Sequence, residues 1–310
     1  MILHVLRYQS KGNYSIENVF NTVRKELGDD FYFRSLQPNK VFDVSAYFKL
    51  LKEQSNTDLI HFTGASNYLA VFPTYNRSIL TIHDIGHFTN SLSGFKKYVY
   101  GKLWFQYPTT NVDLITTVSS FTAGQINRYF NVPFKKIVVV KNPVNPVFRE
   151  SLESFEQSKF KILQIGGGAH KNLTKLLTAV SGLDITLILV RSYDASLDKK
   201  LKGSNIDVEW YSDIPQQELA SLYRTANALF FASTYEGFGL PIIEAQASGV
   251  PVITSNFAPM DEVAGPNGAL FVDPLDTLDI RKALLKLMHD EDERCELISA
   301  GRQNVKRYTP

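Results

Sequence analysis

The sequence predicts an α/β protein built from two doubly wound, Rossmann-like parallel-sheet domains that face each other across a cleft. Short β-branched or apolar runs alternate with segments of helical period along the chain, which is the pattern of βα units. The proline-containing, then polar and acidic stretch 142–159 interrupts this rhythm. The rhythm then restarts, which predicts an N-terminal domain (1–145), a linker (146–159) and a C-terminal domain (160–310).

In the N-terminal half, strands are expected where β-branched and apolar residues cluster. These runs lie at 2–8, 58–63, 78–84, 114–119 and 136–142. Ser15 is predicted to cap a helix that runs to Leu27, and Ser119 or Ser120 to cap one that runs to Tyr129, because a hydroxyl before a helix accepts hydrogen bonds from its first N–H groups.

The C-terminal half repeats this arrangement with longer apolar runs. Strands are expected at 160–166, 185–190, 207–211, 228–233 and 251–255, with helices between them and a last helix near Asp279–Met288. Sheets of this kind bind ligands at the carboxyl ends of their strands.

Composition narrows the class of protein. The chain has 310 residues, of which 44% are hydrophobic and 21% charged, as in soluble globular proteins. Cys295 is the single cysteine, which excludes an internal disulfide framework and favours the reducing cytoplasm. The first residues do not form a signal peptide, and no apolar run reaches the roughly 18 residues that a membrane-spanning helix needs.

Charge is divided unequally between the two halves. Residues 1–145 carry 16 Lys and Arg and 9 Asp and Glu, a net charge of +7; subtraction from the totals of 33 and 31 leaves 17 and 22, or −5, for residues 146–310. Two interpretations stay open: the basic half faces an anionic substrate or lipid surface, or the charges are scattered by chance. The basic half has no nucleic-acid recognition motif, so we expect no nucleic-acid partner.

The stretch ASTYEGFGLPIIEAQASGVPV (232–252) carries the strongest chemical signal. Glu236 and Glu244 flank an apolar run that glycines interrupt. A carboxylate near apolar neighbours needs hydrogen-bond partners, which predicts a ligand rich in hydroxyls. Residues 237–240 are expected to form a strand-to-helix turn with Pro241 at the first helical position and Glu244 in the first turn. The start of such a helix suits a phosphate or diphosphate, so a sugar nucleotide would satisfy the whole stretch.

With its E-x7-E spacing, EGFGLPIIE (236–244) resembles the retaining glycosyltransferases of the GT-B fold, specifically family 4, often called group 1. Other pieces follow in the family's order and extend the resemblance over nearly the whole chain: TIHD (81–84), VSSFT (118–122), VVVKNPVNPVF (138–148), ILQIGGGAHKNL (162–173), LASLYRTANALFFAS (219–233) and DEVAG (261–265). The resemblance implies a nucleotide-sugar donor, a glycan or lipid-linked acceptor and a role in bacterial surface-polysaccharide assembly.

The resemblance also implies roles for single residues of the C-terminal half. Glu244 matches the acid that binds ribose hydroxyls, and Glu236 the acid that contacts hydroxyls of the donor sugar. Lys171 matches the lysine that balances the diphosphate charge as the leaving group departs. The turn matches the backbone that meets the sugar and the diphosphate; it consists of Gly237, Phe238, Gly239 and Leu240.

In the N-terminal half, His83 matches the histidine that reaches towards the anomeric region of the donor. Gly12 and Asn13 occupy the loop that lies near the phosphates in such enzymes. His83 as a core histidine and Lys171 as an ordinary lysine at a helix start are the structural alternatives.

The sequence departs from the family's pattern in three places. Many relatives have an arginine near the lysine, where this chain has Gly167 and His170. Arg191 can supply the missing charge, or it is an exposed arginine at a strand end. The N-terminal loop keeps one glycine instead of a pair, and the sequence stops at RYTP, about where relatives continue into a helix that packs on the first domain.

The resemblance implies a metal-independent, retaining reaction. Substitution takes place on the front face of the sugar, and the departing diphosphate accepts the acceptor's proton while Lys171 and the turn stabilise it. We therefore expect no cofactor and no metal. Asp290 and Asp292, the one D-x-D spacing of interest, are expected to form a solvated acidic turn after the last helix.

The segment 88–108 has two interpretations. Apolar residues recur there at helical spacing and lysines lie among them: Leu92, Phe95, Val99 and Leu103, with Lys96, Lys97 and Lys102. A helix that contacts the inner face of the membrane or a lipid acceptor has this pattern, and so does an ordinary helix that packs on its sheet.

Two alternative functions remain open, and a third is disfavoured. A GT-B sugar-nucleotide epimerase would use the same diphosphate site but would turn over its donor without an acceptor. A non-catalytic nucleotide- or glycan-binding module is compatible with the missing arginine. A dehydrogenase is disfavoured, because the glycines at 166–168 do not complete G-x-G-x-x-G: Lys171 stands at its last position.

Overall fold

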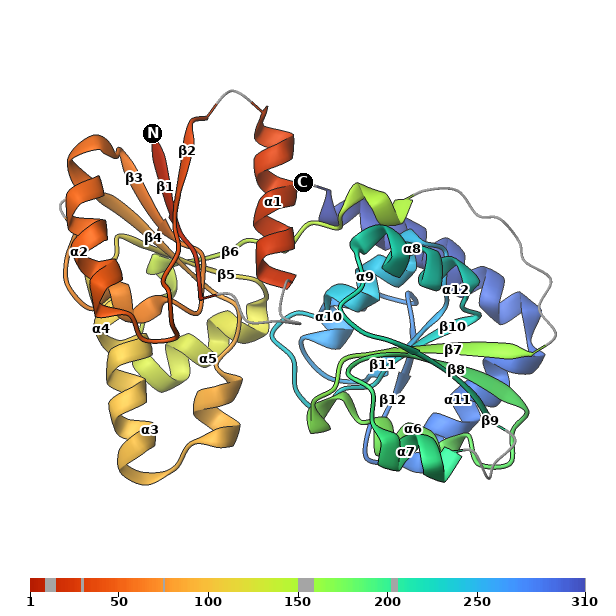
Figure 1. Cartoon of the computed structure of the whole chain (residues 1–310). Coiled ribbons are helices and arrows are strands. Elements are labelled where there is room, and N and C mark those ends of the chain that lie inside the picture. The colour runs from red at the N-terminus through yellow and green to blue at the C-terminus, as the bar shows by residue number, and fades with distance from the viewer. Residues whose placement is uncertain (9–14, 29–30, 75, 150–158, 202–205, 310) are drawn as a thin grey trace. The chain divides into compact units, whose positions relative to one another are not determined.

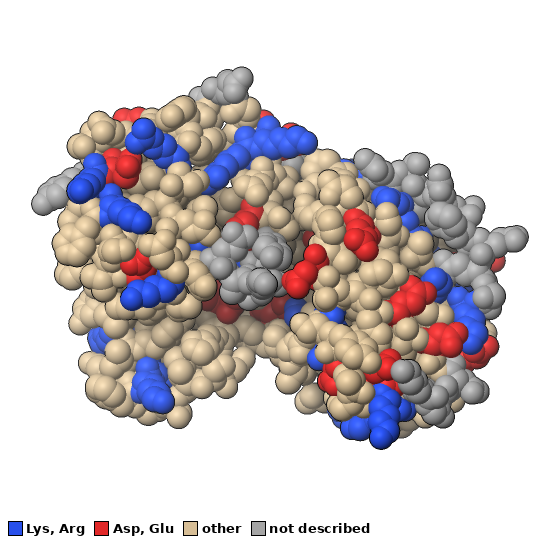
Figure 2. Space-filling view, in the orientation of Figure 1, with Lys and Arg blue, Asp and Glu red and all other residues tan. Residues whose placement is uncertain are grey.

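The computed structural model describes residues 1–8, 15–28, 31–74, 76–149, 159–201 and 206–309. The chain divides into two compact units, Met1–Pro143 and Val144–Thr309. Each unit contains a six-stranded sheet, and helices cover both of its faces (Figure 1). On the face shown in Figure 2, acidic and basic side chains lie among one another on both units.

The sheet of the first unit is parallel throughout, with the order β2-β1-β3-β4-β5-β6. Its strands are β1 (Ile2–Val5), β2 (Phe33–Leu36), β3 (Leu59–Phe62), β4 (Arg77–Ile82), β5 (Leu114–Thr117) and β6 (Ile137–Val139). Its helices are α1 (Ser15–Leu27), α2 (Val44–Glu53), α3 (Gly94–Gly101), α4 (Tyr107–Asn111) and α5 (Ser120–Phe130). The predicted cap at Ser119 is confirmed, because its side chain accepts a hydrogen bond from Thr122 N.

The two faces of this first sheet differ in chemistry, because successive side chains of a strand point to opposite sides. One face is apolar and packs on α2: Leu3, Val5, Ile60, Phe62, Leu80 and Ile82 belong to one core cluster with Ala46 and Leu50 of α2. His4 and His61, which are register partners on β1 and β3, point to the other face. There Phe20 of α1 contacts both imidazole rings.

The second unit repeats the parallel architecture with the strand order β12-β11-β10-β7-β8-β9. Its strands are β7 (Phe160–Ile165), β8 (Ile185–Val190), β9 (Ile206–Tyr211), β10 (Ala228–Phe231), β11 (Val252–Ser255) and β12 (Leu270–Val272). Its helices are α6 (Leu173–Ala179), α7 (Ala195–Leu201), α8 (Gln216–Thr225), α9 (Leu240–Ala247), α10 (Met260–Ala264), α11 (Thr277–His289) and α12 (Glu291–Val305). β10 and β11 are buried along their whole length, as expected for strands covered on both faces.

Two segments outside the strands differ from expectation. Phe148, within the stretch expected to be a linker, is fully buried and lies edge-on to Tyr223 of the second unit. Asp290 and Asp292 do not form a solvated turn after the last helix. Asp290 is the N-cap of the unpredicted helix α12, where its side chain accepts a hydrogen bond from Glu293 N at 2.9 Å, and acidic residues in the first turn match the helix dipole.

Candidate active site

The strand-to-helix turn after β10 has the conformation that the sequence predicts. Gly239 caps α9 with φ of +110°, and a Cβ atom there would lie 3.0 Å from Ile242 Cδ1, so glycine suits this position. Pro241 is the second helical residue instead of the first. Phe238 is buried and lies edge-on to Tyr308, which directs its side chain into the protein.

Lys171 and Glu236, separated by 65 residues, form an ion pair beside this turn. Lys171 Nζ lies 2.6 Å from Glu236 Oε1, and the two side chains are 18% and 14% exposed. Nζ also lies 4.6 Å from the centroid of the Phe231 ring at the end of β10, a cation–π distance. The two predicted ligands of the donor are thus brought together, and each neutralises the other when no anion is bound.

The backbone around Lys171 holds this side chain against the end of the sheet. Gly166, which follows β7, has φ of +101°, and a Cβ atom there would lie 2.9 Å from Lys171 Cε. Asn172 adopts the left-handed conformation and its buried Nδ2 donates to Ala232 O at 3.0 Å and to Pro274 O at 2.7 Å. Sequence reasoning missed Asn172; its signal is an asparagine at a helix start, a residue type that tolerates positive φ.

Glu244 lies one turn further along α9 and has a phenol as its partner. It is the fifth residue of the helix, not a first-turn residue as predicted, because α9 begins at Leu240. Tyr223 of α8 is completely buried and its hydroxyl donates to Glu244 Oε2 at 2.9 Å. Burial raises the pKa of Glu244 to about 7, and the hydrogen bond from Tyr223 partly opposes this. Sequence reasoning assigned no role to Tyr223.

Arg191 lies beside the loop that contains Gly166, Gly167 and Gly168. It follows β8, its N–H donates to Tyr211 O at 2.8 Å, and a Cβ atom on Gly167 would lie 3.9 Å from its Nε. Within the part of the chain that the structure describes, this buried Nε has no hydrogen-bond partner. A buried donor without a partner is costly, so Arg191 is suited to bind an acceptor group of a ligand.

His83 belongs to the first unit, where it follows β4. Its Nε2 lies 2.8 Å from Thr63 O, and a carbonyl only accepts, so Nε2 carries the proton. Burial lowers the pKa of His83, which leaves the ring neutral and Nδ1 with a lone pair. A Cβ atom on Gly64 (φ +115°) would lie 2.5 Å from its Cδ2, so the ring rests on a glycine. Gly12 and Asn13 lie outside the described residues.

His4 and His61 lie beneath α1 in the same unit and are also held neutral. Arg24 Nε donates to His4 Nδ1 at 2.9 Å, and His61 Nε2 lies 2.8 Å from Thr81 Oγ1. Burial lowers the pKa of His4 to about 3, with a smaller contribution from His61 and then Arg24. Burial likewise lowers the pKa of His61 to about 4, followed by the effects of His83 and Arg24.

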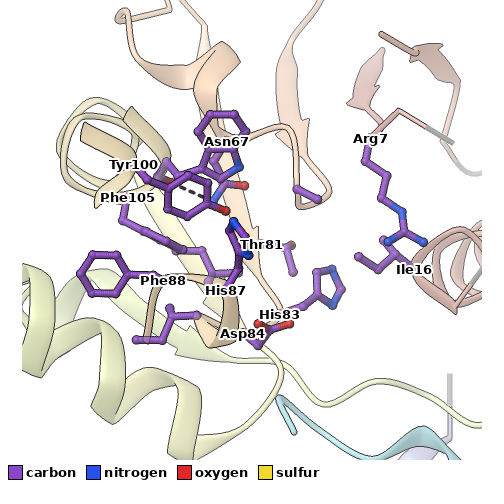
Figure 3. A pocket seen from close by; sticks show the side chains of 14 residues that line it. Arg7, Ile16, Asn67, Thr81, His83, Asp84, His87, Phe88, Tyr100 and Phe105 are labelled. Carbon is purple, nitrogen blue, oxygen red and sulfur yellow. Dashed lines mark hydrogen bonds between the residues drawn. The ribbon is translucent and has the colours of Figure 1, made fainter. Parts of the chain in front are cut away.

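A pocket of about 220 Å³ opens at the carboxyl end of β4. Figure 3 shows Phe88, Tyr100 and Phe105 on one side of it and Arg7 and Ile16 on the other. His83 and Asp84 also line it. The first unit therefore presents an aromatic and polar cavity at the strand ends where such sheets bind ligands.

Two further properties concern metals and membranes. Among the described residues, no three His, Cys, Asp or Glu side chains are grouped so that they could hold a metal ion. Every helix in the described ranges is too short or too polar to cross a membrane.

Comparison with known proteins identifies the family. The model of the family described as "Glycosyl transferases group 1" matches residues 148–304, and that of "Glycosyltransferase Family 4" matches residues 4–148. The O-antigen chain mannosyltransferase B of Escherichia coli is 29% identical over 255 residues, which cover 75% of this chain and 67% of that protein. RfbU, an O-antigen chain mannosyltransferase of Salmonella typhimurium, is 29% identical over 243 residues, which cover 76% of this chain and 67% of RfbU.

Solved structures share the fold over almost the whole chain. HepE of Anabaena, in complex with UDP and glucose, superposes with a TM-score of 0.79 at 13% identity, covering 99% of this chain and 95% of that one. A sucrose-phosphate synthase from Thermosynechococcus elongatus gives a TM-score of 0.78 at 16% identity, with 99% and 94% covered. With two parallel-sheet units and family models that together span residues 4–304, the chain belongs to the group 1 glycosyltransferases and has the GT-B fold.

Proposed function

We propose that this glycosyltransferase moves a hexose from a nucleoside-diphosphate sugar to a glycan or lipid-linked acceptor, with retention of the anomeric configuration. The observation that carries the proposal is the Lys171–Glu236 pair beside the start of α9. It combines a cation for a diphosphate with a carboxylate for sugar hydroxyls. Pro241 has no N–H and Ile242 N donates to Gly239 O at 3.0 Å, so the positive end of the α9 dipole is the second element that favours an anion here.

Binding of the donor would replace the ion pair between Lys171 and Glu236 by contacts of each side chain with the donor. A diphosphate that reaches Lys171 competes with Glu236 for Nζ, and the carboxylate then becomes available for hydroxyls of the sugar. Arg191 Nε has no hydrogen-bond partner among the described residues. Arg191 lies beside Gly167 and is the candidate for the second positive charge. Glu244, steadied by Tyr223, would accept hydrogen bonds from ribose hydroxyls in its ionised form.

The reaction would proceed by substitution on the front face of the sugar. Lys171 and the N–H groups of the turn stabilise the negative charge that develops on the departing diphosphate. The diphosphate accepts the proton of the acceptor hydroxyl. His83, with a lone pair on Nδ1, is assigned to the region of the anomeric carbon. On this proposal the charge is balanced by protein groups and no metal or other cofactor takes part.

The relatives suggest which sugar and which process to test first. Two relatives are named as O-antigen chain mannosyltransferases of bacteria, so we propose mannose as the first sugar and assembly of a bacterial surface polysaccharide as the process. UDP in the HepE complex makes UDP-sugars the second class of donor. The proposed location is the cytoplasm, at the inner face of the membrane.

Contact with that membrane would come from the segment 88–108. Phe95 and Tyr98 are 79% and 62% exposed, and Lys96 is exposed beside them. The apolar stripe is not a continuous exposed face, however, because Leu92, Val99 and Leu103 are half-buried. Exposed aromatic rings with a neighbouring lysine suit the interface of an anionic bilayer.

The test of the reaction is a turnover and thermal-shift screen of GDP-, UDP- and ADP-sugars, each with and without an acceptor extract. We expect one donor to stabilise the protein and to be slowly hydrolysed. Lys171→Met should lower kcat about 100-fold, whereas exposed Lys282→Met should not. If no sugar nucleotide binds, the proposal fails, and conversion of the donor to its epimer without an acceptor would identify an epimerase.

The membrane contact is tested by flotation with vesicles. The full chain should float with phosphatidylglycerol vesicles and not with phosphatidylcholine vesicles, and Phe95→Ser with Lys96→Glu should abolish flotation. Phe48→Ser is the matched control, because Phe48 on α2 is 62% exposed and lies outside the segment. Equal flotation of the double variant and the wild type would contradict the contact.

A further inference from the structure

Helix α2 of the first unit presents an apolar stripe to solvent. Val44, Phe48 and Leu51 stand at positions i, i+4 and i+7, which share one face of a helix, and each is at least 40% exposed. The helix packs on the sheet through Ala46 and Leu50, which are buried. The three exposed residues, called the α2 stripe below, thus lie on an additional apolar side. A contiguous apolar surface on a soluble unit marks a contact site.

The charge beside the α2 stripe is positive. Lys52 follows Phe48 by four residues and therefore lies next to it on the helix surface, and Lys49 is exposed on the same helix. Glu53 at the end of α2 is engaged by Arg34, whose Nη1 lies 2.8 Å from its Oε2. A surface that covers the α2 stripe should therefore combine apolar side chains with carboxylates.

The second unit has two exposed leucines at the start of α11. Leu275 and Leu278 are 66% and 68% exposed. Leu275 directly precedes the N-cap Asp276, a position from which an apolar side chain often packs on the fourth helical residue. Here that residue, Ile280, is fully buried while Leu275 stays in solvent. Both leucines are therefore available to an apolar surface from outside.

Carboxylates surround these leucines. Asp273 and Asp276 are exposed and Asp279 is half-buried. Asp279 Oδ2 accepts a hydrogen bond from Asp273 N at 2.8 Å, which holds the end of β12 against the first turn of α11. The sequence has no lysine or arginine between Arg224 and Arg281. The two leucines and three aspartates, called the α11 patch below, have the composition that the α2 stripe requires.

We propose that two copies of this chain associate head to tail, with the α11 patch of one copy docked on the α2 stripe of the other. The leucines would pack on Phe48 and its neighbours, and the aspartates would lie near Lys49 and Lys52. Docking of one α2 stripe on another would instead bring lysines together, which is unfavourable. The contact accounts for the opposite net charges of the two halves and goes beyond the proposed reaction, since it involves neither donor nor acceptor.

Sedimentation velocity of the full chain tests the association. The weight-average mass should rise above the 35.0 kDa of one chain with protein concentration, and high salt should lower it because ions screen charges at the edge of a contact. Phe48→Ser and Leu278→Ser should each weaken association about tenfold or more. Phe134→Ser and Tyr193→Ser are the controls in the first and second unit, since both side chains are exposed and outside the two surfaces.

A mixture of the two variants tests the head-to-tail arrangement. Phe48→Ser keeps an intact α11 patch and Leu278→Ser keeps an intact α2 stripe, so neither should associate with itself. Mixed in equal amounts, they should form one intact contact and hence a complex of two chains. A contact between two α2 stripes predicts the opposite result, because Leu278→Ser would still associate alone and would gain nothing from the mixture. Urea unfolding checks that both variants are folded.

Three results would overturn the proposal. The wild type remains a monomer at every concentration, or Leu278→Ser associates like the wild type, or the mixture forms no complex although both variants are folded. Flotation distinguishes a membrane as the occupant of the α2 stripe: Phe48→Ser should still float with phosphatidylglycerol vesicles, and loss of its flotation with a monomeric wild type would assign the stripe to the bilayer. Donor turnover by Phe48→Ser and Leu278→Ser should equal that of the wild type, so the proposed reaction is tested separately.

Discussion

The two units bury ionisable side chains of opposite kinds. The first unit covers His4 and His61 with α1 and holds both neutral, with the pKa of each lowered by burial. The second unit holds a half-buried acid, Glu244, and this burial raises its pKa to about 7. Burial disfavours the charged form in each case, so the same cause makes the units respond to acid in opposite directions.

The signs follow from proton binding. The two histidines have pKa values of about 3 and 4 when folded and about 6.5 when unfolded, so they destabilise the folded unit as the pH falls below 6.5. Glu244 has a pKa of about 7 when folded and an ordinary value of 4.5. It therefore costs stability as the pH rises from 4.5 to 7. Between pH 4.5 and 6.5 the units should diverge.

The largest expected effect is acid destabilisation of the first unit. From pH 6.5 to 4.5 its free energy of unfolding should fall by about 3–5 kcal/mol, because each histidine contributes up to about 1.4 kcal/mol per pH unit. The first unit has one tryptophan, Trp104, and the second unit has one, Trp210. In Trp210→Phe, the fluorescence of the remaining Trp104 during urea unfolding reports on the first unit. In Trp104→Phe, the fluorescence of Trp210 reports on the second unit. Equal loss of stability in both units would contradict the comparison.

Glu244→Gln should remove the opposite response of the second unit. Over the same pH range, the free energy of unfolding reported by Trp210 should rise by about 1–2 kcal/mol on acidification when Glu244 is present, and this rise should vanish in the variant. This expected rise in the free energy of unfolding is smaller than the full pKa shift implies, because the Glu244 side chain is only half-buried. Glu296→Gln, at an exposed position of α12, should retain the wild-type rise.

His4→Gln should make the first unit less sensitive to acid while it keeps an acceptor for Arg24. The slope of unfolding free energy against pH should decrease by about 1.4 kcal/mol per pH unit between pH 6 and 4. Urea unfolding followed by Trp104 fluorescence measures this slope. His87→Gln, at an exposed histidine of the same unit, is the control, and an unchanged slope in His4→Gln would show that His4 is not the buried base.

The smallest effect is expected for Tyr223→Phe, which removes one hydroxyl next to Glu244. We expect a loss of about 1 kcal/mol in the stability of the second unit. The pKa of Glu244 should also rise, because the hydrogen bond from Tyr223 lowers it. Titration of the Glu244 carboxyl by NMR measures this shift, with Tyr211→Phe as the control; a fall in the pKa would contradict the assigned role.

The sequence predicted the central strands well and missed an edge strand of each sheet. β2 and β12 lie at the edges and each has one buried residue, Leu36 and Val272. Such strands lack the continuous apolar run by which a buried strand is identified. The helix α12 had a usable signal, because Asp290 followed by Glu293 resembles a capping box.

The proposed site was only partly predictable for a different reason. The family resemblance assigned Lys171 and Glu236 to the donor, but their ion pair across 65 residues is a property of the folded chain. Tyr223 was missed because nothing in a local pattern distinguishes a buried phenol that serves an acid from one that serves the core. For Asn172 the local pattern indicates the left-handed conformation but not its bonds to the carbonyls of Ala232 and Pro274. Such partners become visible only once the strand ends are brought together.

The glycine beneath His83 has a consequence for how activity can be lost. A side chain at position 64 would meet the imidazole at 2.5 Å, so Gly64→Ala would displace the ring as well as strain the backbone. A second glycine, Gly166, lies in the same relation to Lys171 at 2.9 Å. Mutations that inactivate this enzyme should therefore include substitutions of Gly64 and Gly166, although neither residue has a functional group. Each glycine lies behind one of the two side chains, His83 and Lys171, on which transfer would depend.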